Sequence, residues 1–262
     1  MSDRLNFIDI SGYQRGLDLE KVFANNDLDG VIVKATGGTS YVQSTCDPWV
    51  QKLMEMGKLW GFYHFFNDDN KQSGAMNEAA FFVKNCENYF GVGMPFLDYE
   101  GLGLKYGTYG ARVFLEEVYK ATGVKPGIYM NLATLQAATN DEIKIMAEEG
   151  YPLWLAQYGS NKQKKMGDEP WQKGSVAPYE KYTIHQWTSN CRLDGYSGAL
   201  DADYFYGTAE DWKNMLSIEG TSTPYDEGSE DVEVPTTTSN KGNILEALEL
   251  AAEAIENAKR ML

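Results

Sequence analysis

The sequence predicts an α/β fold: an irregular (β/α) barrel of the TIM-barrel type, followed by a flexible linker and a C-terminal helix. Two observations predict the barrel. Apolar, β-branched or aromatic runs recur about eight times, and several gaps between them carry apolar residues at helical spacing. The runs are nearly continuous rather than alternating, which is typical of parallel strands that are covered on both faces. A doubly wound open sheet is the alternative that this pattern allows.

Eight segments are expected to form the strands of the barrel. They are residues 5–11, 30–36, 59–66, 94–100, 125–130, 151–158, 181–188 and 198–205. Four of the gaps are expected to be helical, namely residues 17–25, 47–57, 74–91 and 109–123. Gly57 and Gly123 stand where two of these helices would end, a position that glycine often occupies. The segment 159–180 is interpreted as a loop and the gap 189–197 is too short for a helix, so the later crossovers are expected to be degenerate.

The composition changes near residue 219 and divides the chain into three parts. We expect a barrel domain of residues 1–218, an acidic flexible linker of residues 219–241 and an amphipathic helix of residues 242–262. The linker is rich in Ser, Thr, Gly, Pro and acidic residues. The last segment carries a heptad seam of Ile244, Leu248, Ala251, Ile255, Ala258 and Leu262. Such a helix is marginal alone, so it either folds back on the barrel or binds a second copy or another protein.

The charge balance excludes two classes of partner. The chain has 23 Lys and Arg against 38 Asp and Glu, a net charge of −15. Nucleic acids and anionic membranes both require a basic surface, so neither is an expected partner. No apolar run approaches the roughly 20 residues of a membrane span. The N-terminus lacks a basic start followed by an apolar segment, so we expect no secretory signal and synthesis in the cytoplasm.

Cysteine and histidine are scarce. The three cysteines, Cys46, Cys86 and Cys191, are widely spaced without a CxxC motif, which favours reduced structural thiols over a disulfide. The two histidines, His64 and His185, are too few for a typical zinc site, and no metal or cofactor is expected. Alternation along the strand places His64 opposite its neighbour Tyr63, so His64 is interpreted as structural.

Carboxylates gather where the barrel would open. Asp98 and Glu100 follow the apolar residues 94–97, and residues two apart on a strand share a face. Asp9 lies near the end of the first expected strand and Asp201 lies in the last. In a (β/α) barrel the side chains at the carboxyl ends of the strands converge, and the first and last strands are neighbours. The sequence therefore predicts four carboxyl groups in one mouth.

Such a cluster suits glycoside hydrolysis. That reaction needs one carboxylic acid that stays protonated and one carboxylate that stabilises positive charge on the sugar. Repulsion between Asp98 and Glu100 is expected to keep Glu100 protonated beside a charged Asp98. Binding of Mg²⁺ or Ca²⁺ is an alternative that ranks lower, because no phosphate-binding glycine loop accompanies the acids. The remaining alternative is that the acids merely belong to surface loops.

Seven short motifs carry a resemblance to a known family. FIDIS, GFYHF, FLDYE, GIYMN, LWLAQY, HQW and LDADYF occur in this order. Together they resemble the glycoside hydrolase family 25 lysozymes, the N-acetylmuramidases of phages, bacteria and fungi, over about residues 4–216. The resemblance implies an irregular barrel with a deep acidic groove. It also implies cleavage of the β-1,4 bond from N-acetylmuramic acid to N-acetylglucosamine in peptidoglycan.

The resemblance also implies the roles of individual residues. Glu100 would be the general acid, and Asp98 would assist, either as nucleophile or by orienting the N-acetyl group of the substrate. We favour the second route, with net retention. Asp9 and Asp201 would complete the catalytic group. The expected substrate-binding residues are Tyr63, Tyr129, Trp154, Gln186 and Trp187. Alternation along the strand places Gln186 on the opposite face from His185 and Trp187, but it does not show which face points inward. In the last strand, Asp203 stands where the family usually has Asn.

Two rival functions remain. A chitinase-like N-acetylglucosaminidase barrel also carries a DxE motif, but the upstream acids of its longer motif are missing here and Asp9 is present. A catalytically inactive carbohydrate-binding barrel would usually have lost the acid at Glu100. The absence of a signal and the short C-terminal appendage are typical of a phage endolysin, which is made in the cytoplasm and acts on the bacterial cell wall after release.

Overall fold

The computed structural model describes residues 4–67, 72–101, 104, 107–138, 141–160 and 162–217. The expected linker (219–241) and C-terminal helix (242–262) lie outside the described residues. The strands are β1 (Leu5–Ile10), β2 (Gly30–Gly37), β3 (Tyr41–Val42), β4 (Leu59–Phe65), β5 (Met94–Asp98), β6 (Gly127–Asn131), β7 (Leu153–Ala156), β8 (Ile184–Cys191) and β9 (Leu200–Phe205).

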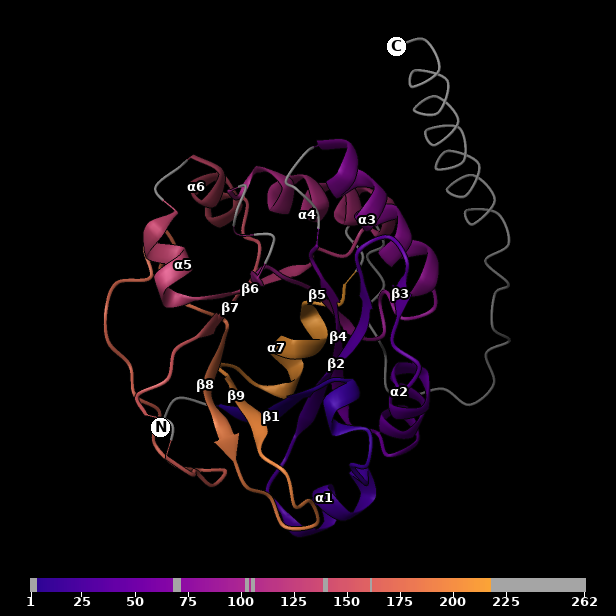
Figure 1. The fold of residues 1–262 in the computed structure, drawn as a ribbon, viewed down its shortest axis with the longest axis vertical. Coiled ribbons are helices and arrows are strands. Elements are labelled where there is room, and N and C mark those ends of the chain that lie inside the picture. The colour runs from indigo at the N-terminus through magenta and orange to yellow at the C-terminus, as the bar shows by residue number, and fades with distance from the viewer. Residues whose placement is uncertain are drawn as a thin grey trace. The chain divides into compact units, whose positions relative to one another are not determined.

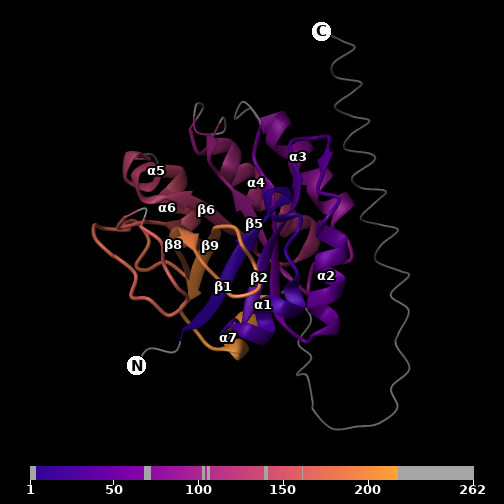
Figure 2. The same cartoon turned by 60° about the horizontal axis from the view of Figure 1, so that its bottom comes forward.

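The helices alternate with the strands in the first two thirds of the chain. They are η1 (Gly12–Gln14), α1 (Leu19–Asn25), α2 (Cys46–Glu55), α3 (Gln72–Asn85), α4 (Tyr109–Thr122), α5 (Leu132–Ala137), α6 (Asp141–Glu148) and α7 (Ala209–Asn214). Figure 1 shows α2, α3 and α4 along one side of the strands, and Figure 2 shows the same grouping after rotation. No helix among the described residues is long and apolar enough to span a bilayer.

The strands close into a barrel. Their order is β1-β9-β8-β7-β6-β5-β4-β2-β3, and β1 also pairs with β2, so the first and last strands of the series join. The short strand β3 lies outside the closed ring, as the second arm of a hairpin with β2. The predicted (β/α) barrel is therefore confirmed over the open-sheet alternative.

The direction of β9 differs from the expectation of a parallel sheet. The pairs from β1–β2 round to β7–β8 are parallel, whereas β9 is antiparallel to both of its neighbours, β8 and β1. The short connection 192–199 explains the difference, because only antiparallel strands can be joined without a long crossover. The beginning of β9 therefore lies at the edge where the parallel strands end.

Two apolar layers stabilise the barrel. One packs between the strands and the surrounding helices, and the other fills the interior. At Gly127 a β-carbon would lie 2.5 Å from the Phe96 ring, so glycine makes room for an inward aromatic side chain. At the far end Trp212 of α7 stacks 4.5 Å from the ring of Phe7 and closes the interior. The packed core thus occupies one end of the barrel and leaves the other end for a cavity.

Most expected elements are present with shifted ends. The expected helices correspond to α1, α2, α3 and α4, whereas β3, α5, α6 and α7 were not expected. The expected strand 94–100 ends at Asp98, because the chain turns at Gly101, which has φ +59°. The expected helix 74–91 ends at Asn85. The segment 159–180 contains no helix or strand among its described residues, as predicted.

The predictions for the three cysteines and for His64 are confirmed. All three cysteines are free and buried. His64 is fully buried on the outer face of β4, where its Nε2 lies 2.7 Å from Glu78 Oε2 and its Nδ1 lies 2.7 Å from Thr36 Oγ1. Its neighbour Tyr63 faces the interior of the barrel. His64 is therefore a packed structural residue.

Candidate active site

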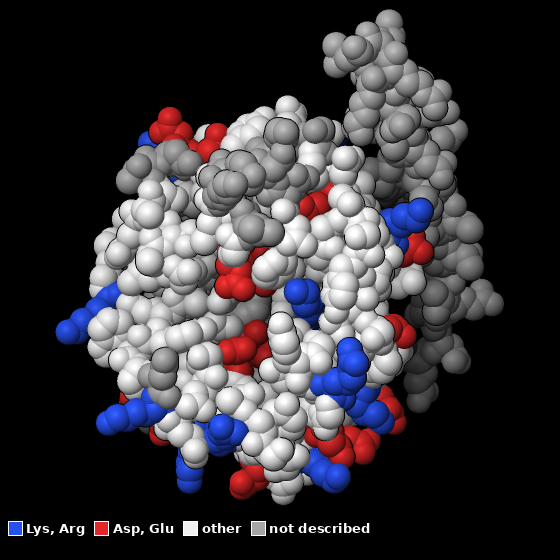
Figure 3. Space-filling view, in the orientation of Figure 1, with Lys and Arg blue, Asp and Glu red and all other residues white. Residues whose placement is uncertain are grey.

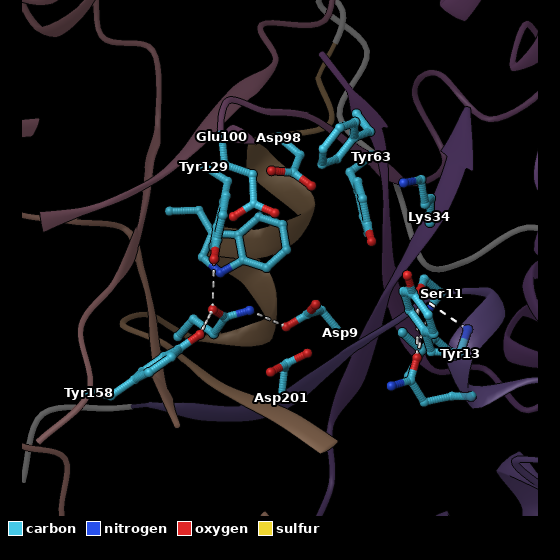
Figure 4. A pocket seen from close by; sticks show the side chains of 15 residues that line it. Asp9, Ser11, Tyr13, Lys34, Tyr63, Asp98, Glu100, Tyr129, Tyr158 and Asp201 are labelled. Atoms are coloured by element: carbon cyan, nitrogen blue, oxygen red, sulfur yellow. Dashed lines mark hydrogen bonds between the residues drawn. The ribbon is translucent and has the colours of Figure 1, made fainter. Parts of the chain in front are cut away.

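A cavity of about 500 Å³ opens at the carboxyl end of the parallel strands. It is lined by all four carboxyl groups predicted for the mouth, those of Asp9, Asp98, Glu100 and Asp201. Figure 3 shows acidic atoms in a hollow near the centre of this face, with a basic group at its edge. Figure 4 shows the four carboxyl groups between two walls: Tyr63 lies on one side and Tyr129 on the other.

Strand alternation places Asp98 and Glu100 on one side of the chain. Asp98 is the last residue of β5, and the Tyr99 between the two acids turns outward into the outer core. The Tyr99 backbone N–H donates to the Tyr129 carbonyl over 3.0 Å, and its hydroxyl donates to the carbonyl of Gly107. These bonds fix the outward residue of the motif, so both carboxyl groups face the cavity.

Asp9 and Asp201 meet across two paired strands. Their Cα positions are partners in the antiparallel register of β1 and β9. Asp201 was expected in the mouth as part of a (β/α) barrel, in which the last strand would run parallel to β1. Asp201 does lie in the mouth as expected. It reaches the mouth because it stands at the beginning of β9, which runs antiparallel to β1.

Burial raises the pKa of every carboxyl group in the cluster. For Asp98 the charge of Glu100 adds to burial, and for Asp9 the charges of Asp201 and Asp203 add. The pKa of Glu100 is also raised by burial, and the pKa of Asp201 rises to about 6 through burial and the charge of Glu100. The cluster therefore retains protons toward neutral pH.

The cause of these shifts differs from the sequence-based expectation. Repulsion was expected to keep Glu100 protonated beside a charged Asp98. Burial is instead the first cause, and it acts on both acids; Asp98 is 7% exposed, while Glu100 is only half-buried. Burial therefore raises the pKa of both carboxyl groups and not that of Glu100 alone.

Gln186 joins the two sides of the cavity floor. Its Oε1 accepts hydrogen bonds from the Tyr129 hydroxyl over 2.9 Å and from the Tyr158 hydroxyl, and its Nε2 donates to Asp9 Oδ2 over 2.6 Å. Figure 4 shows these bonds as dashed lines. The amide oxygen thus faces the two hydroxyl groups and the amide nitrogen faces Asp9, which holds the Asp9 carboxyl in place.

A fifth carboxyl group lies beneath the cavity. Asp203 is fully buried, and its Oδ1 accepts a hydrogen bond from Trp154 Nε1 over 2.8 Å. Its Oδ2 has no hydrogen-bond partner among the described residues. Burial raises the pKa of Asp203, while the bond from Trp154 lowers it. Trp154 lines the cavity but is only 2% exposed, so its indole serves chiefly as part of the interior core.

Trp187 lies away from the cavity. It is 2% exposed and stacks on Tyr204 in the outer layer, with ring centroids 5.1 Å apart and planes at 7°. His185 shares this outer face, where its Nε2 lies 2.9 Å from the Gln157 carbonyl oxygen. Alternation along β8 therefore turns Gln186 inward and Trp187 outward, and the predicted substrate contact of Trp187 does not fit its position.

Several residues that line the cavity were not predicted. They are Ile10, Ser11, Tyr13, Gln14, Lys34, Phe65 and Tyr158. Tyr158 could have been found, because it shares a face with Trp154 in the run LWLAQY. Lys34 is the single charge in the run GVIVKAT, which is also a signal. The described residues contain no group of three or more His, Cys, Asp or Glu side chains that could hold a metal ion.

Comparisons with known proteins identify what the chain resembles. Residues 8–196 match the sequence model of glycosyl hydrolases family 25. A curated relative, the N,O-diacetylmuramidase of Arthroderma benhamiae, is 27% identical over 175 residues, with coverage of 62% of this chain and 72% of the relative.

Solved structures of lysozymes share the barrel. The family 25 lysozyme of Aspergillus fumigatus is 24% identical, with coverage of 82% of this chain and 100% of that chain and a TM-score of 0.63. The lysozyme of Streptomyces coelicolor is 20% identical, with coverage of 82% and 98% and a TM-score of 0.65. The catalytic domain of endolysin ply40, from a bacteriophage of Listeria monocytogenes, is 22% identical, with coverage of 82% and 98% and a TM-score of 0.63. These likenesses support the irregular barrel fold.

Proposed function

The chain belongs to family 25 of the glycosyl hydrolases, and on that premise we propose that it is a lysozyme in which Glu100 is the general acid and Asp98 assists. The bond cleaved is the β-1,4 bond between N-acetylmuramic acid and N-acetylglucosamine in peptidoglycan. One observation carries the assignment of residues. Asp98 and Glu100 face one cavity from adjacent inward positions, and burial raises the pKa of both.

Glu100 suits the proton donor. It is half-buried at the cavity wall, so its carboxyl can reach a bound glycosidic oxygen, and its raised pKa keeps a proton available. As the bond from C1 to the leaving oxygen breaks, the Glu100 proton moves to that oxygen. The resulting carboxylate then accepts a proton from water in the second step.

Asp98 suits the orientation of the substrate. Its Oδ1 is buried without a hydrogen-bond partner among the described residues, which is costly unless a ligand supplies a donor. The N–H of the acetamido group on the sugar would supply it. The acetamido oxygen would then attack C1 as the leaving oxygen departs, and water would open the cyclic intermediate with net retention.

The remaining acids and aromatic residues would hold the sugar and its charge. Asp9, oriented by Gln186, and Asp201 would stabilise the positive charge that develops at C1. Tyr63 and Tyr129, on opposite walls, would contact the sugar faces.

Product analysis tests the function directly. Peptidoglycan is digested with the protein and reduced with borohydride, and the new reducing end is identified. Muramicitol is the expected product. Glucosaminitol would instead assign the protein to the N-acetylglucosaminidases, the class that includes the chitinase-like rival, and no new reducing end would indicate an inactive carbohydrate-binding barrel.

We infer that the bacterial cell wall is the place of action, because peptidoglycan is found there. Synthesis in the cytoplasm before release, as in an endolysin, is part of the same proposal. Association through residues 242–262 is a separate hypothesis, since those residues lie outside the described part of the chain.

A further inference from the structure

Lys34 places a single positive charge in the wall of an acidic cavity. Among the described residues that line the cavity, Lys34 is the one cation beside four carboxyl groups. It lies on β2, where its Cα is the partner of Tyr63 on β4. Figure 4 shows Lys34 and Tyr63 on the same wall, across the cavity from Tyr129 and Tyr158.

A β-bulge follows Lys34 on β2. The β2–β4 register shifts between Lys34 and Thr36, so Ala35 is an extra residue on β2. Before the bulge Lys34 faces the cavity beside Tyr63, and after it Thr36 faces outward with His64. Without the bulge Thr36 would face inward with Lys34. Alternation with the inward Ile32 thus places Lys34 at the cavity wall, and the bulge turns Thr36 away from the cavity to bond His64.

Aromatic rings surround the Lys34 ammonium group. Its Nζ lies 4.2 Å from the centroid of the Phe65 ring and 5.8 Å from those of Tyr41 and Tyr63. Among the described residues, none forms an ion pair with the Lys34 ammonium group and none accepts a hydrogen bond from it. This half-buried ammonium lines the cavity, so its N–H donors are available to an acceptor on a bound ligand.

The charges around Lys34 decide which acceptor it can bind. Burial lowers the pKa of Lys34, and the nearby charges of Asp98 and Glu100 offset part of this shift. Elsewhere the cavity wall carries carboxyl groups, which repel an anionic substituent of a glycan. Such a substituent is therefore attracted only toward the β2 wall.

We propose that Lys34 binds the carboxylate of the lactyl ether on the muramoyl residue and so orients the glycan with this substituent toward β2. The inference rests on the proposed function, since only a muramoyl glycan carries that group. A charge-assisted hydrogen bond from Nζ to the carboxylate would satisfy the unused donors. Lys34 would thus be a specificity residue, and the enzyme would prefer glycan strands whose lactyl carboxyl is free.

A matched pair of substrates tests this proposal. One is a peptide-free glycan strand with free lactyl carboxylates, and the other is the same strand with each carboxylate converted to its neutral methylamide. The measured quantity is the ratio of kcat/KM on the acid form to kcat/KM on the amide form. The wild type is expected to favour the acid form, and Lys34→Met is expected to lower the ratio about tenfold, the effect of one hydrogen bond to a charged group.

Two further variants control the measurement. Lys34→Arg keeps the charge and is expected to keep most of the preference. Lys58→Met removes another half-buried lysine whose Nζ lies 4.8 Å from an aromatic centroid, that of Phe23, outside the cavity lining. It is expected to leave the ratio unchanged, and thermal melting checks that each variant folds.

The outcomes separate this inference from the proposed function. A wild type that releases no muramicitol end from intact peptidoglycan would reject the muramidase assignment itself, whereas muramicitol from peptidoglycan without cleavage of either strand would reject the preference for a free lactyl carboxylate. Cleavage of both strands with a ratio that Lys34→Met does not change would reject only the role of Lys34. Equal losses on both strands would show that Lys34 acts on the Asp98 and Glu100 carboxyl groups rather than on the lactyl group.

Discussion

Asp201 lies directly opposite Asp9 in the antiparallel register of β9 and β1. The two residues come from opposite ends of the barrel sequence, and they meet because β9 reverses direction after a short connection. Burial and the charge of Glu100 raise the pKa of Asp201 to about 6. This pairing converts the Asp98 and Glu100 motif into a cluster of four acids around one cavity.

Glu100→Gln is expected to abolish wall lysis while the fold remains intact. The amide fills the same space but cannot donate an acidic proton, and loss of a general acid typically costs about 10²–10⁴-fold in rate. Clearing of Gram-positive cell walls and thermal melting measure the two effects. The matched control is Glu87→Gln, at an exposed turn residue that follows α3. Near-wild-type clearing by Glu100→Gln would reject the assignment.

Asp98→Asn is expected to be nearly as damaging as Glu100→Gln, because the neutral amide would no longer orient the acetamido group as the Asp98 carboxylate does. Clearing of Gram-positive cell walls measures the loss.

Assistance by the substrate's acetamido group also predicts net retention, so the first anomer formed by the wild type should be β. Proton NMR during the first turnovers identifies that anomer. An initial α-anomer would exclude both a covalent Asp98 intermediate and assistance by the substrate.

Asp203→Asn is expected to flatten the dependence of stability on pH. Burial raises the native pKa of Asp203, so between the unfolded value of about 3.9 and the native value the native state binds more protons. This contribution to stability is complete below the unfolded pKa and is lost as pH rises through the native pKa. The Asn oxygen can still accept from Trp154 Nε1, so the fold should persist.

Urea unfolding at about pH 4.5, 6 and 7.5 measures this effect as the free energy of unfolding. The loss of stability with rising pH should be smaller in Asp203→Asn than in the wild type. Asp194→Asn, at an exposed position, is the control. Parallel curves for the wild type and Asp203→Asn would contradict a raised native pKa at Asp203.

Trp154→Ala is expected to destabilise the fold and not only to weaken substrate binding. Trp154 was expected to line the groove, but it is 2% exposed and contacts Phe96 and Tyr129 in the interior. Its removal leaves a cavity and an unpaired buried Asp203, at a cost of about 3–5 kcal/mol in the free energy of unfolding. Urea unfolding measures the loss; Trp171→Ala, at a residue 45% exposed, should cost less.

The heptad seam in residues 242–262 predicts self-association. Sedimentation of the full chain is compared with that of a chain that stops at Gly220. A larger mass for the full chain is expected, and identical monomer masses would remove the hypothesis.

Much of the site could be predicted because period-two alternation decides which residues of a strand share a face. That rule places Asp98 with Glu100 and separates Tyr63 from His64, as the structure has them. It also separates Gln186 from Trp187, but alternation alone does not say which face is inward. The outward stacking of Trp187 on Tyr204 depends on how β8 pairs with β9, which is a tertiary property.

The sequence by itself determined the class of barrel, the four acids of its mouth and the structural nature of His64 and the cysteines. These features follow from local patterns, namely strand runs, helix spacing and alternation, which need no knowledge of distant contacts. Only the tertiary structure decided the reversal of β9, the burial that raises the carboxyl pKa values, and the outward turn of Thr36 after the register of β2 shifts at Ala35. Burial and strand register arise from contacts between segments far apart in the chain, and no local pattern encodes them.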